Sequence, residues 1–82
     1  MPTIAIVDGV EIQMFDNDHA PPHFHAILGG DELLVAIANL DVIRRSLPSA
    51  KHRQVLQWAA DHQGGLALNW IRCQANLAPE RM

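Results

Sequence analysis

The spacing of apolar residues changes half-way along the chain, and no other feature limits the fold as strongly. In the first half, apolar and polar residues alternate, which is the period of a β-strand with one buried face. In the segment VEIQM, for example, Val10, Ile12 and Met14 are apolar and the residues between them are polar. In the second half, apolar residues recur every three or four positions, as on one face of a helix. This order predicts an α+β fold with the strands first and the helices last.

Turn sequences divide the first half into four or five strands. Asp8-Gly9 is a typical two-residue hairpin turn, and Gly29-Gly30 provides a second turn further along the chain. Between them lies a loop with Pro21 and Pro22, which cannot lie inside a central strand. The expected strands are residues 3–7, 10–14, 23–28 and 33–37, followed by a short edge strand at 41–45.

Two helices are expected after the strands. Ser49 is a suitable N-cap for a helix that runs to about Gln63, where Gly64-Gly65 would end it. The apolar stripe of the second helix consists of Leu66, Trp70, Cys73 and Leu77. We therefore expect a small antiparallel sheet of four to five strands with both helices packed on one face.

The length of 82 residues predicts a single domain, mostly β over 1–46, helical over 47–78 and ending in a tail over 79–82. A domain of this size buries only about 60–65% of its unfolded surface, so the strands and helices have to share one core. The single cysteine, Cys73, excludes an internal disulfide and a zinc site made of several cysteines. Because Cys73 lies on the apolar stripe, we expect an inert, buried thiol.

The net charge argues against a general nucleic-acid-binding protein, and the start of the chain argues against a secreted one. The net charge is −3, whereas non-specific nucleic-acid binding requires clustered Lys and Arg. The basic residues that do gather, Arg44 and Arg45 with Lys51 shortly after, would make any such contact local. No signal peptide is evident, and no segment approaches the ~18–20 apolar residues of a membrane span. We therefore expect a cytoplasmic protein without membrane contact.

Three of the five histidines gather in the eleven residues DNDHAPPHFHA. His19 precedes the stiff Pro-Pro pair, and His23 and His25 follow it at the start of an expected strand. Imidazole donates and accepts protons near neutral pH and is a frequent metal ligand. These three histidines are therefore the candidate catalytic residues.

The alternation along the strands also predicts where the histidine pair points. Successive side chains of a strand point to opposite faces of the sheet. If the apolar residues face the helices, then His23 and His25 face the other side, together with Glu11 and Gln13 of the preceding strand. No later element is left to cover that side, so we expect these side chains on an open sheet face.

Two interpretations of the histidines involve no catalysis by the imidazoles themselves. In the first, His23 and His25 bind a metal ion, completed by Asp16, Asp18 or His19 to the three or four ligands that zinc requires. However, His-x-His alone is a weakly specific motif and no distant ligand is evident, so we predict no metal and no cofactor. In the second, the histidines hydrogen-bond to loop carbonyls and are structural.

The third interpretation is acid–base catalysis. His23 and His25 would act as base and acid in metal-independent cleavage of RNA. Arg44, Arg45 or Lys51 would bind the phosphate. The spacing permits this chemistry without being specific for it.

The chain also resembles a known family. The opening MPTI, the stretch D-H-x-P-P-H-F-H-A from Asp18 to Ala26, and a Q-W-A helix followed by N-W are similar to the domain of unknown function 4160 family of small bacterial proteins. The similarity extends over nearly the whole chain, although Ala20 stands where the family often has Asn. The resemblance implies a partnership with a second small protein, as in type II toxin–antitoxin pairs, with this chain as the toxin. It implies no mechanism.

Two functional hypotheses follow. In the first, the protein is the toxin of such a pair and acts on RNA through the histidine-rich loop and the open sheet face. The residues that would bind the target are Glu11, Gln13, Arg44, Arg45 and Lys51. In the second, it is a non-enzymatic interaction module or regulator whose exposed edge strand docks a cognate, antitoxin-like small protein. A homo-oligomer is compatible with both hypotheses.

Overall fold

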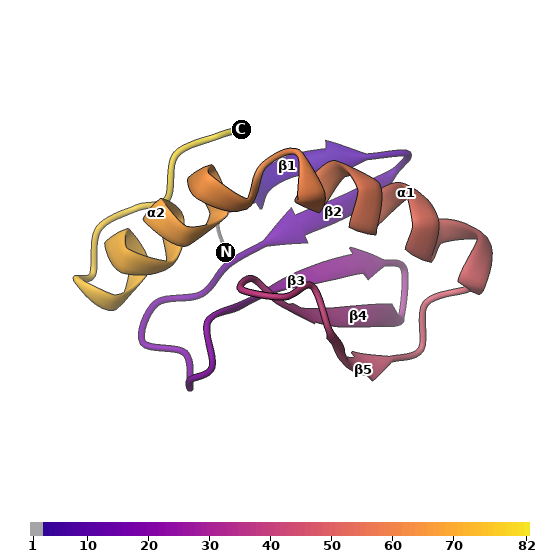
Figure 1. Cartoon of the computed structure of the whole chain (residues 1–82), viewed down its shortest axis with the longest axis horizontal. Coiled ribbons are helices and arrows are strands. Elements are labelled where there is room, and N and C mark those ends of the chain that lie inside the picture. Colours follow the sequence, from indigo (N-terminus) through magenta and orange to yellow (C-terminus); the bar gives the residue numbers. More distant parts are fainter. Residues whose placement is uncertain (1–2) are drawn as a thin grey trace.

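The computed structural model describes residues 3–82 and contains one five-stranded sheet and two helices (Figure 1). Met1 and Pro2, which belong to the predicted domain and to the MPTI motif, lie outside the described residues. The strands are β1 (Thr3–Val7), β2 (Val10–Gln13), β3 (His23–Leu28), β4 (Asp31–Ala36) and β5 (Val42–Arg45). The helices are α1 (Ser49–Ala60) and α2 (Gln63–Gln74). The predicted α+β class, with a small antiparallel sheet and two C-terminal helices, is confirmed.

Each strand pairs antiparallel with the next one along the chain, so the sheet order is β1-β2-β3-β4-β5. Asp8 and Gly9 form the first hairpin turn with positive φ angles of 50° and 81°, which a type I′ turn requires. Gly29 has a φ of 60° in the turn between β3 and β4. The peptide bond between Ala20 and Pro21, in the loop before β3, is cis.

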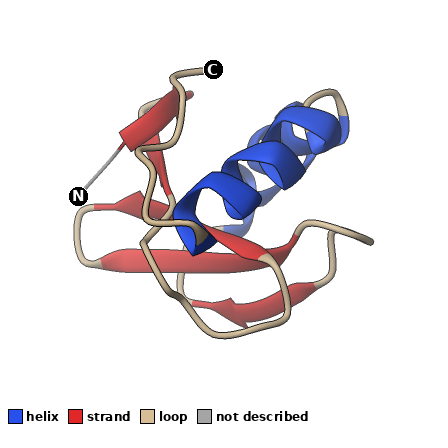
Figure 2. Ribbon diagram, turned by 90° about the vertical axis from the view of Figure 1, so that its left-hand side faces the viewer, coloured by secondary structure: helices blue, strands red, loops and turns tan. Residues whose placement is uncertain are grey.

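Both helices lie on one side of the sheet (Figure 2). Their buried apolar residues pack against those side chains of the strands that point to this side, and together they form one core. The largest fully buried side chains from the strands include Phe24, Ile4, Ile12 and Leu33, and the fully buried Met14 directly follows β2. From the helices, Val55, Ala59, Leu66 and Cys73 are fully buried, and Trp70 is nearly so. Neither described helix is long and apolar enough to cross a membrane.

The predicted boundary between the two helices was wrong. The first helix ends at Ala60, and Gly64 and Gly65 lie in the first turn of α2. The side chain of Gln63 holds the start of α2 by donating to the carbonyl of Ile37 at 2.8 Å. A Cβ at Gly65 would lie 2.6 Å from Cε of Met82, the flexible end of a side chain in the returning tail.

The end of the chain also differs from the prediction. The second helix ends at Gln74, so Leu77 is outside it and half exposed rather than on its apolar stripe. The following residues fold back along α2, where the buried Asn69 side chain binds the backbone N–H and carbonyl of Glu80 at 2.8 and 2.9 Å. The tail then reaches the outer edge of β1, and the Met82 N–H donates to the carbonyl of Ile4 at 2.7 Å.

Candidate functional site

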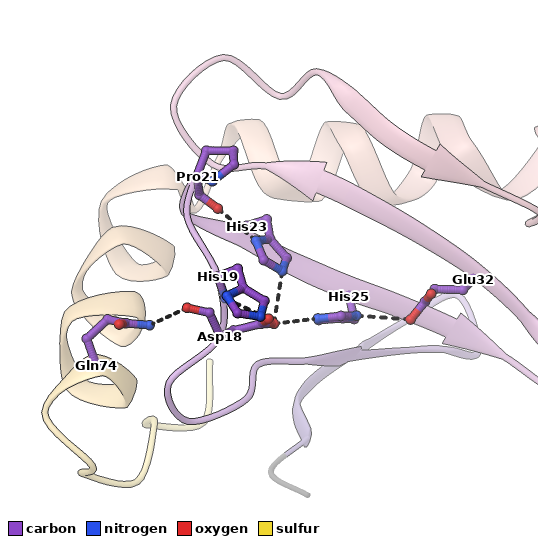
Figure 3. Close-up of polar contacts among 7 residues, drawn as sticks. All are labelled: Asp18, His19, Pro21, His23, His25, Glu32 and Gln74. Atoms are coloured by element: carbon purple, nitrogen blue, oxygen red, sulfur yellow. Dashed lines mark hydrogen bonds and ion pairs between the residues drawn. The ribbon is translucent and has the colours of Figure 1, made fainter.

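Asp18 is the centre of a polar cluster at the start of β3 (Figure 3). Its Oδ2 lies 2.9 Å from Nε2 of His23 and 2.9 Å from Nε2 of His25. Its Oδ1 accepts the backbone N–H of His19 at 2.9 Å. Asp18, His23 and His25 each offer one potential metal-ligand atom, and these three atoms lie within 4.8 Å of one another. The loop and the strand therefore direct three ligand-type groups to one point.

The second ring nitrogen of each histidine contacts a fixed oxygen atom. Nδ1 of His23 donates to the carbonyl of Pro21 at 2.7 Å. Nδ1 of His25 lies 2.9 Å from Oε2 of Glu32 on β4. A carbonyl and an ionised carboxylate only accept hydrogen bonds, so both Nδ1 atoms carry a proton. Both imidazole rings are thus fixed in orientation.

Strand register explains how Glu32 reaches the cluster. His25 lies opposite Gln13 on β2 and opposite Leu34 on β4. Glu32 is two residues from Leu34, so its side chain is on the same sheet face and diagonal to His25. The sequence prediction missed Glu32, although the Gly29-Gly30 turn and the alternation along β4 would have placed it there.

The loop between β2 and β3 is fastened to the C-terminal end of α2. The side-chain amide of Gln74 donates to the carbonyl of Asp18 at 3.2 Å. The side chains of Asn17 and Asn76 are joined by a hydrogen bond of 2.8 Å. These contacts hold Asp18 above the strand that carries the two histidines.

Aromatic rings enclose the histidines. The ring of His23 lies 5.3 Å from that of Trp70, and the ring of Phe15 meets the ring of His25 edge-on at 4.4 Å. His23 is consequently only 5% exposed, so the expectation that both histidines lie openly on the sheet face was wrong for His23. His25 is partly buried and remains accessible from one side.

The surroundings of Asp18 favour its ionised form. Burial alone would raise the pKa of this carboxyl, but the hydrogen bonds from His25 and from the His19 N–H lower it. The positive charges of His23 and His25 act in the same direction, and the net pKa lies below its ordinary value of 3.8. Asp18 therefore remains a carboxylate throughout the physiological pH range.

A cavity of about 340 Å³ opens beside the cluster. Asp18 lines it from the loop before β3, and His23 and His25 line it from β3. Ile43 and Arg44 line it from β5. The loop residues His19, Ala20 and Pro21 complete the wall, together with Glu32 and Leu34 of β4. A ligand in this cavity would contact both the cluster and a guanidinium group.

The family model for the domain of unknown function DUF4160 matches residues 9–71, which include the whole cluster. The chain belongs to the DUF4160 family. No curated protein and no solved structure matches the chain. The DUF4160 description assigns no activity to the family.

Of the basic residues predicted to bind a target in this DUF4160 chain, Arg44 alone lines the cavity. Arg45 lies opposite the core residue Leu33 and therefore points to the other sheet face. Lys51 is distant from the cavity and binds the Asp8 carboxylate at 3.1 Å.

The two polar residues predicted on β2 lie near the cluster but not in the cavity wall. Glu11 is opposite Ile27 and accepts hydrogen bonds from the side chains of Thr3 and Gln13. Gln13 is directly opposite His25 and is only 8% exposed. Its Oε1 has no hydrogen-bond partner among residues 3–82.

The Cys73 thiol of the DUF4160 chain is fully buried, as predicted. Burial raises its pKa, and the negative charge of Asp16 adds to this effect against a smaller opposite influence of Arg72. The sulfur is therefore protonated at neutral pH and is no nucleophile.

Proposed function

We propose that this DUF4160 protein is a toxin-like bacterial protein that binds and cleaves RNA at the cavity beside β5, in the cytoplasm. The observation that supports this proposal is the composition of the cavity, in which an arginine, an exposed histidine and the Asp18 cluster surround a space of about 340 Å³. A cation for phosphate and an imidazole for proton transfer are the groups that phosphodiester cleavage requires.

Arg44 is the phosphate-binding residue in this proposal. Its guanidinium carries a permanent charge and can bind two phosphate oxygens at once. Within residues 3–82, no ion pair engages Arg44, so its donors are available to a ligand. The two carboxylates that also line the cavity, Asp18 and Glu32, each contact imidazole rings, which reduces their repulsion of an anion.

His19 is the histidine best placed to exchange a proton with the substrate. Its side chain is exposed and lines the cavity, and its ring makes no hydrogen bond to any residue from 3 to 82. By contrast, both ring nitrogens of His23 and His25 are engaged inside the protein. His19 thus takes the 2′-hydroxyl proton as base and then returns a proton to the leaving 5′-oxygen as acid, and His23 and His25 position the cluster.

The test compares Arg44→Gln with Arg45→Gln in an RNA-cleavage assay with purified protein. The two residues are adjacent on β5 but point to opposite sheet faces. Loss of a charge-assisted hydrogen bond of about 1.5–3 kcal/mol predicts a cleavage rate roughly 10- to 100-fold lower for Arg44→Gln, whereas Arg45→Gln retains the wild-type rate. Equal rates for the two variants, or no cleavage by the wild type, would contradict the proposal.

A second function, docking of a cognate small protein, is favoured by the position of β5. This strand pairs with β4 and has no second neighbour within the described part of the chain, so its outer edge is open (Figure 1). Ile43 on β5 is 49% exposed and also lines the cavity. An antitoxin-like partner that adds a strand to β5 would therefore lie beside the cavity and cover it.

A further inference from the structure

We propose that Asp18, His23 and His25 bind one divalent first-row transition-metal ion. The ligand atoms are Oδ2 of Asp18 and Nε2 of each histidine, and they converge from the loop and the strand (Figure 3). Their mutual distances, all within 4.8 Å, are those of atoms that can share one ion at bond lengths of about 2.0–2.2 Å. The site does not depend on RNA cleavage, because its three ligand atoms alone define it.

The ligand side chains also make the hydrogen bonds that are typical of metal ligands, through the atoms that would not bind the ion. A metal-binding histidine usually donates its other ring N–H to a carbonyl or a carboxylate, which fixes its tautomer and orientation. His23 donates from Nδ1 to the carbonyl of Pro21 at 2.7 Å, and His25 from Nδ1 to Glu32 at 2.9 Å. The Oδ1 atom of Asp18 is likewise held by the His19 N–H, so that Oδ2 is directed to the common point. Glu32 is therefore a positioning residue of the site.

The burial of the cluster fits a bound ion that stays open to a substrate. The side chains of His23, His25 and Asp18 are 7%, 14% and 21% exposed, so bulk water has little access to them. All three nevertheless line the cavity. Three protein ligands with an open position on one side are the arrangement of catalytic rather than structural metal sites.

Ligand chemistry determines the class of ion. Two imidazole nitrogens and one carboxylate oxygen suit Zn²⁺ and Fe²⁺, and the latter is often held by two histidines and one carboxylate. Mg²⁺ and Ca²⁺ prefer sites made of oxygen atoms. When bound, such an ion would polarise a phosphoryl oxygen or a water molecule in the cavity.

The experiment measures metal binding without RNA, so its outcome is separate from that of the cleavage assay. Untagged protein is stripped with a chelator and titrated with Zn²⁺, with Fe²⁺ under anaerobic conditions, and with Mg²⁺. We expect one Zn²⁺ or Fe²⁺ per chain by elemental analysis and calorimetry, and no binding of Mg²⁺. Free metal at 100 times the Kd should raise the Tm by roughly 10–20 °C.

Variants of the cluster test whether the metal ion binds there. His25→Asn should abolish it, and Glu32→Gln should weaken it by about 10- to 100-fold because the orientation of His25 is lost. Glu11→Gln is the matched control on the same sheet face, and His62→Gln is the control for a histidine outside the cluster. Both controls should bind like the wild type. Circular dichroism verifies that each variant is folded.

Two results would overturn the metal site. The first is a wild-type protein that binds neither Zn²⁺ nor Fe²⁺, which would leave the cluster as a hydrogen-bonded network. The second is unchanged affinity in both His25→Asn and Glu32→Gln, which would place the ion elsewhere. If His25→Asn does not fold, Glu32→Gln against Glu11→Gln decides the question.

Discussion

Asp18 is the residue on which the site depends, because its carboxylate accepts hydrogen bonds from two imidazoles and one backbone N–H. Its carbonyl in addition accepts from Gln74, so the same residue connects β3, the loop and α2. The charge of this carboxylate thereby contributes to folding as well as to the site. A group whose pKa is lowered in the folded state stabilises that state above its unfolded pKa.

We predict that Asp18→Asn destabilises the metal-free protein by about 1–3 kcal/mol at pH 7, the cost of leaving buried donors without an acceptor. In the wild type the stabilisation is present above the ordinary pKa of 3.8 and is lost as the pH falls through the lower folded-state pKa. The difference between the two proteins should therefore shrink below pH ~4. Urea unfolding at pH 7 and at successively lower pH measures it, and a constant difference would refute the role of the charge.

At the residue scale, the sequence predicted part of the site. Clustering identified His19, His23 and His25, and alternation placed Gln13 on the sheet face of His25, where the structure pairs the two residues. The roles within the cluster could not be predicted, because they depend on a loop conformation. Hydrogen bonds from distant residues such as Gln74 hold this loop, and they leave no periodic pattern in the sequence.

At the scale of elements, the strands were predictable and the helix ends were not. Hairpin turns such as Asp8-Gly9 and the alternation along β2 and β3 are local signals, and all five expected strands are present, although β4 begins at Asp31 rather than at residue 33. Glycine is normally a helix-end signal, but Gly64 and Gly65 lie in the first turn of α2, and Gly65 lies beside the Met82 side chain of the returning tail. A contact with a residue 17 positions later cannot be read from a local pattern.

The returning tail is held to α2 by one side chain, and this gives a prediction for that element. Asn69→Ala removes both hydrogen bonds to the backbone of Glu80 and should cost about 1–3 kcal/mol. The amide hydrogens of Glu80 and Met82 should then exchange faster, whereas Ile71→Ala, at an exposed position of α2, should change neither the stability nor the exchange. Hydrogen exchange followed by NMR is the measurement. Unchanged exchange at Met82 would show that the tail is held by other contacts.

At the scale of the whole molecule, the two edges of the sheet are unequal. The outer edge of β1 is occupied in part by the tail, through Met82 and the carbonyl of Ile4. The outer edge of β5 is free within residues 3–82 and adjoins the cavity. A protein that docks by strand addition therefore has one preferred edge, and its binding there would block access to the site.

We predict that Ile43→Lys prevents co-purification with the cognate small protein and that Ile6→Lys does not. Both isoleucines are exposed, at 49% and 61%, but they lie on the opposite edge strands β5 and β1. A charge at the β5 edge disfavours pairing with a second strand. Light scattering measures the mass of the complex and so distinguishes a homodimer of this chain from a complex with the cognate protein. Equal loss of the partner in both variants would exclude β5 as the docking edge.

The contact between Met82 and Ile4 has a consequence for chain connectivity. Since the two ends of the described chain meet at the β1 edge, a short peptide could join them, and the chain could be opened at the exposed Gly29-Gly30 turn instead. Asp18, His23 and His25 would then come from the last segment of the new chain and Glu32 from the first. Separately expressed, one half would hold all three groups of the cluster, and only the other would supply Glu32, which orients His25.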